Sequence, residues 1–475
     1  MLQKKDNSSR IVLILYYISR FIYYFQAFYL LRYWLEREER GVYGLVKSTA
    51  FLFGQLDLGD AILRYFPYFR HSKKRKAALL GWVILLNSII YVLLLLLFCM
   101  WNSRFDGNAS AFIPLIFTKG YLVLLSVLLK SWFSVLRRVV WPNFVQHIIF
   151  NLLTIGCFYA YYRFDFSFDN LLLLTLVPNV VHLLLLLGRL YWLGELSISW
   201  ERRFLPPGFF RSFLLYGFFV LPVSHCFSIL MRMDTWMVGQ YLGWGVAATY
   251  VALLKLTLFI DVPRKVSKQF ILPRLSHLLA KENYKKANEV YKRQVTEQFF
   301  ISSVTFFFLY LNWSWYLVYL PDLTTDLKEM FQVFVLLGCA KVCYNVFYSS
   351  IKLLLLSRHY LYSSINLLGF FVGLKTIEWF VQMYGIWGAA LGILSFTLLW
   401  GLGNMFLVWY TVRLNPLSFP MLYVLPLALL LFFLKDLVIF GLPFLDYALQ
   451  NVLLGGAYVY IRRAQRSYFL RQKDY

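Results

Sequence analysis

Apolar runs long enough to cross a membrane recur along the whole sequence. A hydrocarbon core about 30 Å thick needs about 20 apolar residues in a helix, and the first such run extends from Ile11 to about Leu31. Hydrophobic residues make up 60% of the 475 residues and charged residues 15%, whereas soluble domains average about 25% charged residues. The sequence therefore predicts an all-α polytopic membrane protein and excludes soluble, disordered and disulfide-scaffold classes. About fourteen transmembrane helices are predicted, at residues 11–31, 42–63, 79–101, 111–129, 143–162, 170–188, 212–231, 244–263, 298–319, 329–351, 359–381, 384–411, 419–440 and 442–461.

Basic residues are unevenly distributed among the predicted loops. The formal net charge is +24, and Lys and Arg concentrate in alternate segments, chiefly Arg64–Lys76, Arg264–Arg293 and the tail from Arg462. Cytoplasmic loops of membrane proteins carry such an excess. The distribution predicts that both termini are cytoplasmic, and it accounts for the charge without a nucleic-acid partner.

Two polar segments organise the chain. The first, residues 195–211, is the predicted boundary between two halves. The second, from Arg264 to Gln298, is predicted to contain a helix at the cytoplasmic surface, with leucines on one side and lysines elsewhere. The predicted parts are an N-terminal six-helix bundle (1–194), a cytoplasmic linker (195–211), a C-terminal six-helix bundle (212–411), and two additional helices with a basic cytoplasmic tail (412–475).

Four short motifs resemble those of a known family. Asp57-Leu-Gly followed by Ala61-Ile-Leu-Arg-Tyr-Phe-Pro67 resembles the second-helix motif of the polysaccharide-exporter branch of the multidrug/oligosaccharidyl-lipid/polysaccharide (MOP) superfamily. The segments from Arg232 to Gly243, Phe270 to Ser276 and Tyr384 to Ala390 resemble later motifs of the same family, in the same order.

The resemblance implies a fold and a function. Family members include O-antigen and other lipid-linked glycan flippases, built from two six-helix bundles around a central cavity, with two further C-terminal helices in many members. It implies that helices 1, 2, 7 and 8 line the cavity. The expected function is translocation of a polyprenyl-diphosphate oligosaccharide across the bacterial inner membrane by alternating access, for surface polysaccharide biosynthesis.

Basic residues within the predicted spans are the candidate substrate contacts. A Lys or Arg at mid-bilayer costs about 2.5–3.5 kcal/mol on insertion scales, so such residues tend to line water, pair with a carboxylate or bind substrate. Arg20, Lys47, Arg232 and Lys255 fall on the helices that the resemblance places around the cavity. Charge-assisted hydrogen bonds from such groups suit a diphosphate, and Arg20 and Lys255 are predicted as its principal contacts. For Lys47 and Arg232, snorkelling to an interface is an equal alternative.

The acidic residues near these spans have either a coupling or a structural role. Asp57, Asp60 and Asp234 belong to this group, together with Arg64, because the spacing of Asp60 and Arg64 permits an ion pair on one helix face. A buried ion pair is also predicted between Lys375 and Glu378. Neither Lys119 nor Lys341 has a partner in its own predicted helix.

No catalytic or cofactor pattern is present in the sequence. The histidines are scattered, no Gly-x-x-x-x-Gly-Lys loop for phosphate occurs, and the five cysteines lie within apolar runs without metal-site spacing. We therefore expect a non-enzymatic protein without metal or cofactor.

Two alternatives to the flippase remain open. A multidrug or small-molecule antiporter of the same superfamily would favour an anionic cavity for cationic drugs, and the basic residues in the spans argue against it. A membrane polysaccharide polymerase or glycosyltransferase would normally carry a large outer loop, and the outer loops here are short. The expected partners of a flippase are lipid-linked oligosaccharide, membrane lipids, and a polysaccharide polymerase with other assembly proteins.

Overall fold

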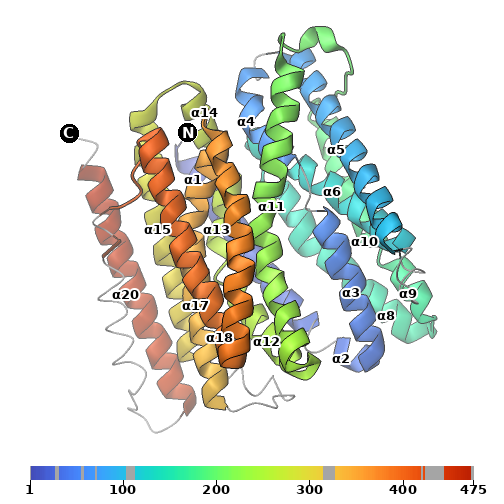
Figure 1. Ribbon diagram of the computed structural model, residues 1–475, viewed down its shortest axis with the longest axis vertical. Helices are drawn as coiled ribbons and strands as arrows, with labels where there is room; N and C mark the ends of the chain where they lie inside the picture. Colours follow the sequence, from blue (N-terminus) through green and yellow to red (C-terminus); the bar gives the residue numbers. More distant parts are fainter. Residues whose placement is uncertain are drawn as a thin grey trace. The chain divides into compact units, whose positions relative to one another are not determined.

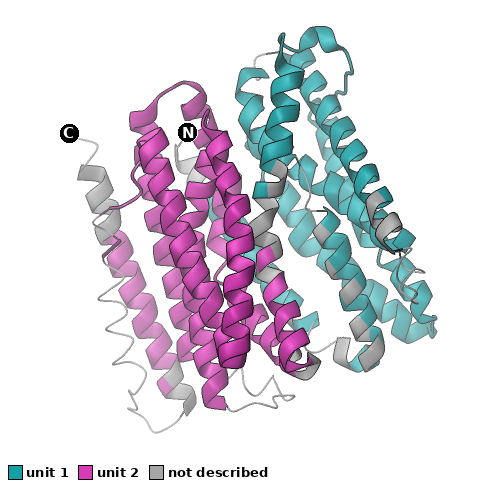
Figure 2. Ribbon diagram, in the orientation of Figure 1, with its two compact units in different colours: residues 1–225 teal, residues 226–475 magenta. Residues whose placement is uncertain are grey.

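The computed structural model contains only helices and connecting turns in the part of the chain that it describes (Figure 1). That part comprises residues 2–26, 31–54, 58–69, 72–102, 113–313, 327–418, 421–422 and 443–471. It divides into two compact units, Met1–His225 and Cys226–Tyr475 (Figure 2). The all-α class predicted from the apolar runs is confirmed.

Unit 1 is built from long helices interrupted by short breaks. The second predicted span is two helices, α3 and α4, rather than one. A π-helical turn, η3, joins α7 to α8 without a loop. The elements are α1 (Leu2–Phe25), α2 (Leu31–Trp34), α3 (Arg37–Gly54), α4 (Gly59–Phe69), α5 (Lys73–Asn102), α6 (Ile113–Val135), α7 (Val140–Phe144), η3 (Val145–Ile149), α8 (Phe150–Phe164), α9 (Phe168–Leu174), α10 (Val177–Trp192), η4 (Arg202–Phe204) and the first part of α11 (Phe209–Leu242).

Unit 2 is organised around α17, which packs against α15 and α18. Most of the residues of α17 from Met330 onward are buried, so this helix forms the centre of the unit. The remaining elements are α12 (Trp244–Thr257), α13 (Val262–Phe270), α14 (Leu272–Ala280), α15 (Tyr284–Leu311), α17 (Leu327–Leu356), η5 (Tyr360–Ser364), α18 (Ile365–Val412) and α20 (Pro443–Arg471).

Six helical stretches within the described residues are long and apolar enough to cross a membrane. One of them, Tyr360–Val412, contains two predicted spans. Gly385 divides it with φ of 61°, a left-handed conformation that glycine adopts without strain. The thirteenth predicted span, 419–440, lies almost entirely outside the described residues.

The two halves of α18 pack closely through glycines. An added Cβ at Gly369 would meet the ring of Trp400, and one at Gly373 would meet the ring of Phe396. Small residues of this kind let two helices approach each other closely within a membrane. The aromatic side chains of the second half therefore fill the space that the glycines of the first half leave.

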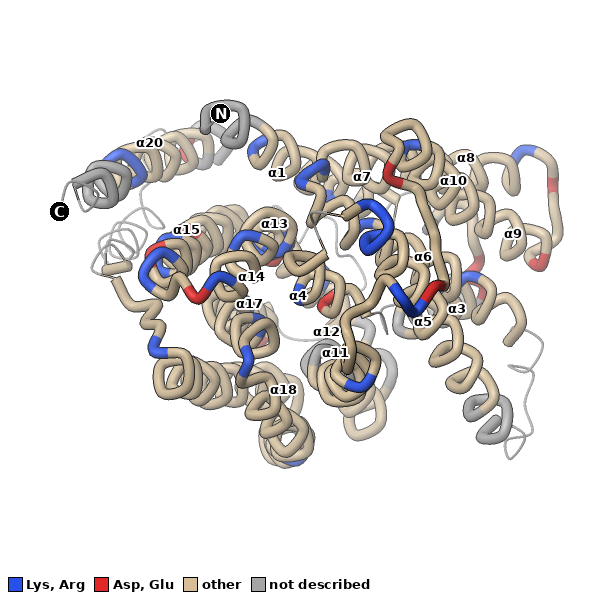
Figure 3. Tube along the Cα trace, turned by 90° about the horizontal axis from the view of Figure 1, so that it is seen from above, with Lys and Arg blue, Asp and Glu red and all other residues tan. Residues whose placement is uncertain are grey.

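The polar segment after Arg264 is helical almost throughout, as α13, α14 and the first half of α15. Leu275 on α14 is fully buried, whereas Lys285 and Lys286 on α15 are exposed. The single two-sided helix predicted here is therefore wrong, because the segment is divided between α14 and α15. Figure 3 shows Lys and Arg gathered around α13, α14 and the start of α15. The position of these helices at a membrane surface stays a prediction.

Two segments predicted to be cytoplasmic meet at one end of unit 1. Nζ of Lys76 lies 2.6 Å from a carboxylate oxygen of Glu195, and the backbone N–H of Ser199 donates to the carbonyl of Ala77 at 3.2 Å. The contact agrees with the predicted alternation of the loops, which requires both segments on one side of the membrane. That this side is the cytoplasm stays a prediction.

Candidate functional site

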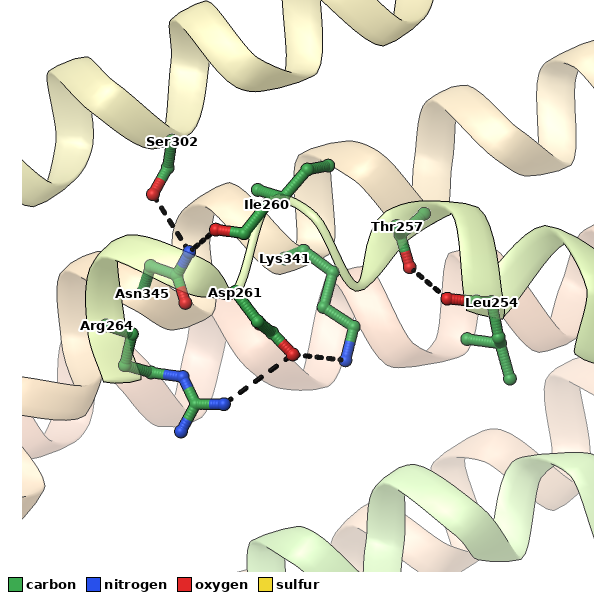
Figure 4. Close-up of polar contacts among 8 residues, drawn as sticks. All are labelled: Leu254, Thr257, Ile260, Asp261, Arg264, Ser302, Lys341 and Asn345. Atoms are coloured by element: carbon green, nitrogen blue, oxygen red, sulfur yellow. Dashed lines mark hydrogen bonds and ion pairs between the residues drawn. The ribbon is translucent and has the colours of Figure 1, made fainter. Parts of the chain in front are cut away.

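A break between α12 and α13 places polar and charged groups in the interior of unit 2. The predicted span 244–263 is wrong at its end, because α12 stops at Thr257 and the chain turns before Val262. Pro263 cannot donate a backbone hydrogen bond to the preceding turn, so Val262 donates to Phe259 instead, at 3.2 Å. In the same turn, the carbonyl of Ile260 accepts a hydrogen bond from the side-chain amide of Asn345 (Figure 4).

Asp261 lies in this break, between two cations. Its Oδ2 is 3.6 Å from Nη2 of Arg264 and 3.6 Å from Nζ of Lys341 (Figure 4). The Asp261 side chain is only 5% exposed and that of Lys341 10%. Burial of such charges is costly unless they are paired, so each of the three ionised groups depends on its neighbours.

Aromatic rings enclose the guanidinium group of Arg264. The carbon at the centre of that group is 4.7 Å from the ring centroid of Tyr344 and 4.8 Å from that of Tyr348. Both rings are on α17, one turn apart. Arg264 is therefore held by cation–π contacts as well as by Asp261.

Asp234, on α11, extends the same network. Its carboxylate accepts hydrogen bonds from the backbone N–H of Thr235 at 2.6 Å and from the hydroxyl of Tyr250 at 2.9 Å. Asp234 is fully buried, and Lys341 attracts it electrostatically. We term Asp234, Lys341, Asp261 and Arg264 the ion network of unit 2; its ion pairs join Asp261 to Arg264 and to Lys341. The buried Lys352 lies beside the network, with its Nζ 5.7 Å from the ring centroid of Tyr348.

Replacing Tyr250 with phenylalanine is expected to lower the free energy of unfolding by about 1.5–3 kcal/mol, because the lost hydrogen bond goes to a buried carboxylate. Tyr291→Phe is the matched control. Tyr291 is equally buried in unit 2, and its hydroxyl is 2.6 Å from that of the neutral Ser350. Its loss should cost only about 0.5–1.5 kcal/mol. Denaturant unfolding of the two purified variants in detergent measures the loss in the free energy of unfolding of each. Equal losses would contradict the hydrogen bond from Tyr250 to an ionised Asp234.

The four basic residues predicted to contact substrate lie on different helices and differ in their surroundings. Arg20 is partly exposed on α1, and Lys255 is partly buried on α12. The ammonium group of Lys47 lies 5.0 Å from the ring centroid of Tyr23. The side chain of Arg232 lies outside the described part of the chain. The assignment of these four residues to substrate stays a prediction.

The structure describes only part of the predicted coupling or structural group of Asp57, Asp60, Arg64 and Asp234. Asp57 lies outside the described residues. Asp60 is buried on α4, and the guanidinium carbon of Arg64 lies 4.6 Å from the ring centroid of Tyr216. Both charges act electrostatically on the Tyr216 hydroxyl, so Asp60 and Arg64 share one environment at the end of unit 1. Their predicted role in coupling stays untested.

The predicted pair of Lys375 and Glu378 is present, but it is not buried. Nζ of Lys375 lies 2.7 Å from Oε2 of Glu378, and the Lys375 side chain is 82% exposed. The hydroxyl of Tyr241 donates a second hydrogen bond to the same carboxylate, at 2.7 Å. The prediction was wrong about burial because these residues lie on the outer face of α18.

Sequence reasoning missed Asp261 and the partner of Lys341. Asp261 falls within a predicted transmembrane span, although Pro263 two residues later signals a helix break. Lys341 lacked a partner in its own helix, and its partner comes from a segment 80 residues earlier in the chain.

Comparisons with known proteins identify the fold. No family model and no curated protein matches the sequence. A multidrug resistance MATE family transporter of the MOP superfamily, in an outward-facing conformation, superposes with a TM-score of 0.66 and 14% identity over 86% of this chain and 96% of its own. A mutant of the Vibrio cholerae MATE transporter VcmN gives 0.66 and 12% identity over 86% and 98%.

A third similar structure differs from these two in the reported polarity of its binding pocket. It is a MOP superfamily transporter from Pyrococcus furiosus, with a TM-score of 0.63 and 14% identity over 85% of this chain and 95% of its own. It is described as having a binding pocket of reverse polarity that suggests a different function. The chain thus has the fold of these transporters, and its membership of the superfamily predicted from the motifs stays a prediction. The polysaccharide-exporter branch stays a prediction.

Proposed function

We propose that this chain is a membrane transporter that moves an organic solute across the bilayer by alternating access. The fold carries the proposal, because similarity to MATE transporters extends over 86% of the chain with a TM-score of 0.66. The first of these transporters is a multidrug resistance protein. The comparisons therefore favour export of a small organic molecule over movement of a lipid-linked oligosaccharide.

Within this proposal the ion network of unit 2 serves in coupling. A proton on either buried carboxylate would remove a negative charge from beside the buried cations, and a buried charge without a partner is costly. Exchange of a proton or a sodium ion at Asp234 or Asp261 would thus favour a different arrangement of α11, α13 and α17. We propose this pair of carboxylates as the link between a transmembrane gradient and transport.

A second candidate is a flippase for a lipid-linked oligosaccharide in the bacterial inner membrane. Two observations favour it: the four motifs that resemble the polysaccharide-exporter branch, and the basic residues Lys47 and Lys119 in the interior of unit 1. A cationic drug would be repelled by these lysines, whereas a diphosphate would be attracted. A polysaccharide polymerase and other assembly proteins would be its partners.

Proteoliposomes that contain the purified protein test the main proposal. We expect uptake of a small organic dye when a proton or sodium gradient is imposed, with the anionic carboxyfluorescein preferred to the cationic ethidium. Asp261→Asn should abolish uptake and the exposed Lys375→Met should not. Failure to transport either dye under any gradient would remove the small-molecule proposal.

Depletion of the protein in its host tests the second candidate. A membrane-impermeant glycan probe applied to oriented vesicles locates the lipid-linked glycan. Complete repeat units that accumulate on the cytoplasmic face, with loss of surface polymer, would establish a flippase. Repeat units that reach the outer face but stay unpolymerised would indicate a polymerase, and an unchanged distribution would leave the small-molecule transporter.

A further inference from the structure

The interface between α15 and α17 is polar in one half and apolar in the other. The polar half carries seven side chains that face one another, and each of these residues is at most 2% exposed. From α15 they are Tyr291, Gln294, Gln298 and Ser302, and from α17 they are Asn345, Ser349 and Ser350. Spacing of three or four residues places the α15 set on one face of its helix. We term these seven residues the polar ladder.

Three side chains form a series of hydrogen bonds across the polar ladder. The amide nitrogen of Gln294 donates to the hydroxyl of Ser349 at 2.8 Å, and that hydroxyl donates to Oε1 of Gln298 at 3.0 Å. Oε1 of Gln294 and Nε2 of Gln298 have no hydrogen-bond partner among the described residues. Reversing both amides would exchange donor for acceptor but would still leave one polar atom of each side chain without a partner.

Asn345 links the polar ladder to the break that holds Asp261. Its amide nitrogen donates to the hydroxyl of Ser302 at 2.9 Å and to the carbonyl of Ile260, the residue before Asp261 (Figure 4). A carbonyl only accepts hydrogen bonds, so the amide nitrogen of Asn345 must face it. Oδ1 of Asn345 then has no partner in the part of the chain that the structure describes.

Aromatic rings close the apolar half of the same interface. Beyond Ser302, the ring of Phe306 on α15 lies 6.2 Å from that of Phe334 on α17, and Phe334 stacks on Trp313 at 4.8 Å. Phe306 also covers Gly338, where an added Cβ would lie 2.2 Å from its ring. The polar ladder thus extends from the α12–α13 break toward the exposed start of α15 and not in the opposite direction.

We infer that the polar ladder is a one-sided water path to Asp261, through which the coupling proton reaches this carboxylate from the side of the membrane that holds the start of α15. Buried polar groups without a protein partner are costly, and ordered water satisfies such groups. Water molecules between the unpartnered amide atoms would join the serine and tyrosine hydroxyls into a continuous series of hydrogen bonds. This inference rests on the proposed coupling role of Asp261 and adds the side from which it is reached.

Silver ion, which is small and binds a thiolate that water reaches, tests the path apart from transport. The reporter is Ser302→Cys in the full-length protein, with alanine in place of the five native cysteines. Silver nitrate in chloride-free buffer is added to one side of oriented proteoliposomes, and the remaining thiol is labelled with N-ethylmaleimide after denaturation. We expect modification only from the side that holds the start of α15. Val333→Cys, fully buried in the apolar half of α17, is the matched control and should stay unmodified.

Adding Gln294→Leu is expected to slow the modification of Ser302→Cys by about tenfold or more, because an apolar side chain of similar length excludes water from the path. Gln294→Ser, which is polar and smaller, should leave the rate within a few-fold of that of the reporter alone. The unfolding temperature of each variant is measured alongside, so that a loss of fold is not mistaken for an open path.

Three outcomes would overturn the inference. These are a Ser302→Cys variant as unreactive as Val333→Cys, equal modification from both sides of the membrane, and a rate that Gln294→Leu does not change. The first would show that the polar ladder is a dry set of hydrogen bonds that holds α15 to α17. If silver ion reaches Ser302→Cys but no solute is transported, the proposed function fails and the path stands. If transport occurs while both thiols stay unreactive, the path fails alone.

Discussion

Replacing Asp261 with asparagine is expected to lower the free energy of unfolding by about 3–5 kcal/mol, the cost of removing one partner from a buried ion pair. Asp261 is the carboxylate that Arg264 and Lys341 share, with both nitrogen atoms 3.6 Å from its Oδ2. In Asp261→Asn both cations stay buried while their common counter-charge is lost. The loss should be measured by denaturant unfolding of the purified protein in detergent.

The Lys341→Met variant distinguishes loss of charge balance from loss of packing. Alone, it should cost less than Asp261→Asn, because Asp261 keeps Arg264 as a partner. Combined with Asp261→Asn, it removes one of the two uncompensated cations, so the double variant should be more stable than the sum of the single changes predicts. Simple additivity would show that the ion network does not act as a unit.

An exposed ion pair in the same unit provides the control. Arg293 and Glu297 are one turn apart on α15, with Nε 3.0 Å from Oε1 and both side chains about half exposed. Surface pairs contribute about 0–1 kcal/mol, so Glu297→Gln should have little effect. A loss as large as that of Asp261→Asn would show that burial is not the cause.

The Gly388→Ala variant is expected to lose about 3 kcal/mol, at the upper end of what overpacking costs. A Cβ added at Gly388 would lie 1.9 Å from the carbonyl oxygen of Phe380. Because the obstacle is backbone, no change of rotamer relieves the clash. The two halves of α18 would have to separate at the Gly385 kink, and the unfolding temperature of the purified variant in detergent would report this.

Gly403→Ala is the matched control on the same helix. A Cβ at Gly403 meets nothing within 4 Å, and alanine favours a helix over glycine by up to about 1 kcal/mol. This variant should therefore be as stable as the original or slightly more so. If Gly388→Ala unfolded at the same temperature as Gly403→Ala, the result would contradict the close packing of the two halves of α18 at Gly388.

Local sequence was enough to predict most of the helices, because a transmembrane helix needs only a run of apolar residues. It was also enough to predict the superfamily fold, from four short motifs in order. It failed at the α12–α13 break, where the apolar run continues past Thr257 although the helix does not. Pro263 carried the signal, but hydropathy alone does not register a lost backbone donor.

The amino-acid sequence by itself determined that this chain is a helical membrane protein with an excess of basic residues and with charges inside its apolar runs. Only the tertiary structure decided which charges meet. Asp261 and Lys341 are 80 residues apart, and Gln294 and Ser349 come from different helices, so their interactions depend on how the helices pack. The physical reason is that apolar periodicity is a property of one helix, whereas the cost of a buried charge depends on the groups that other helices place beside it.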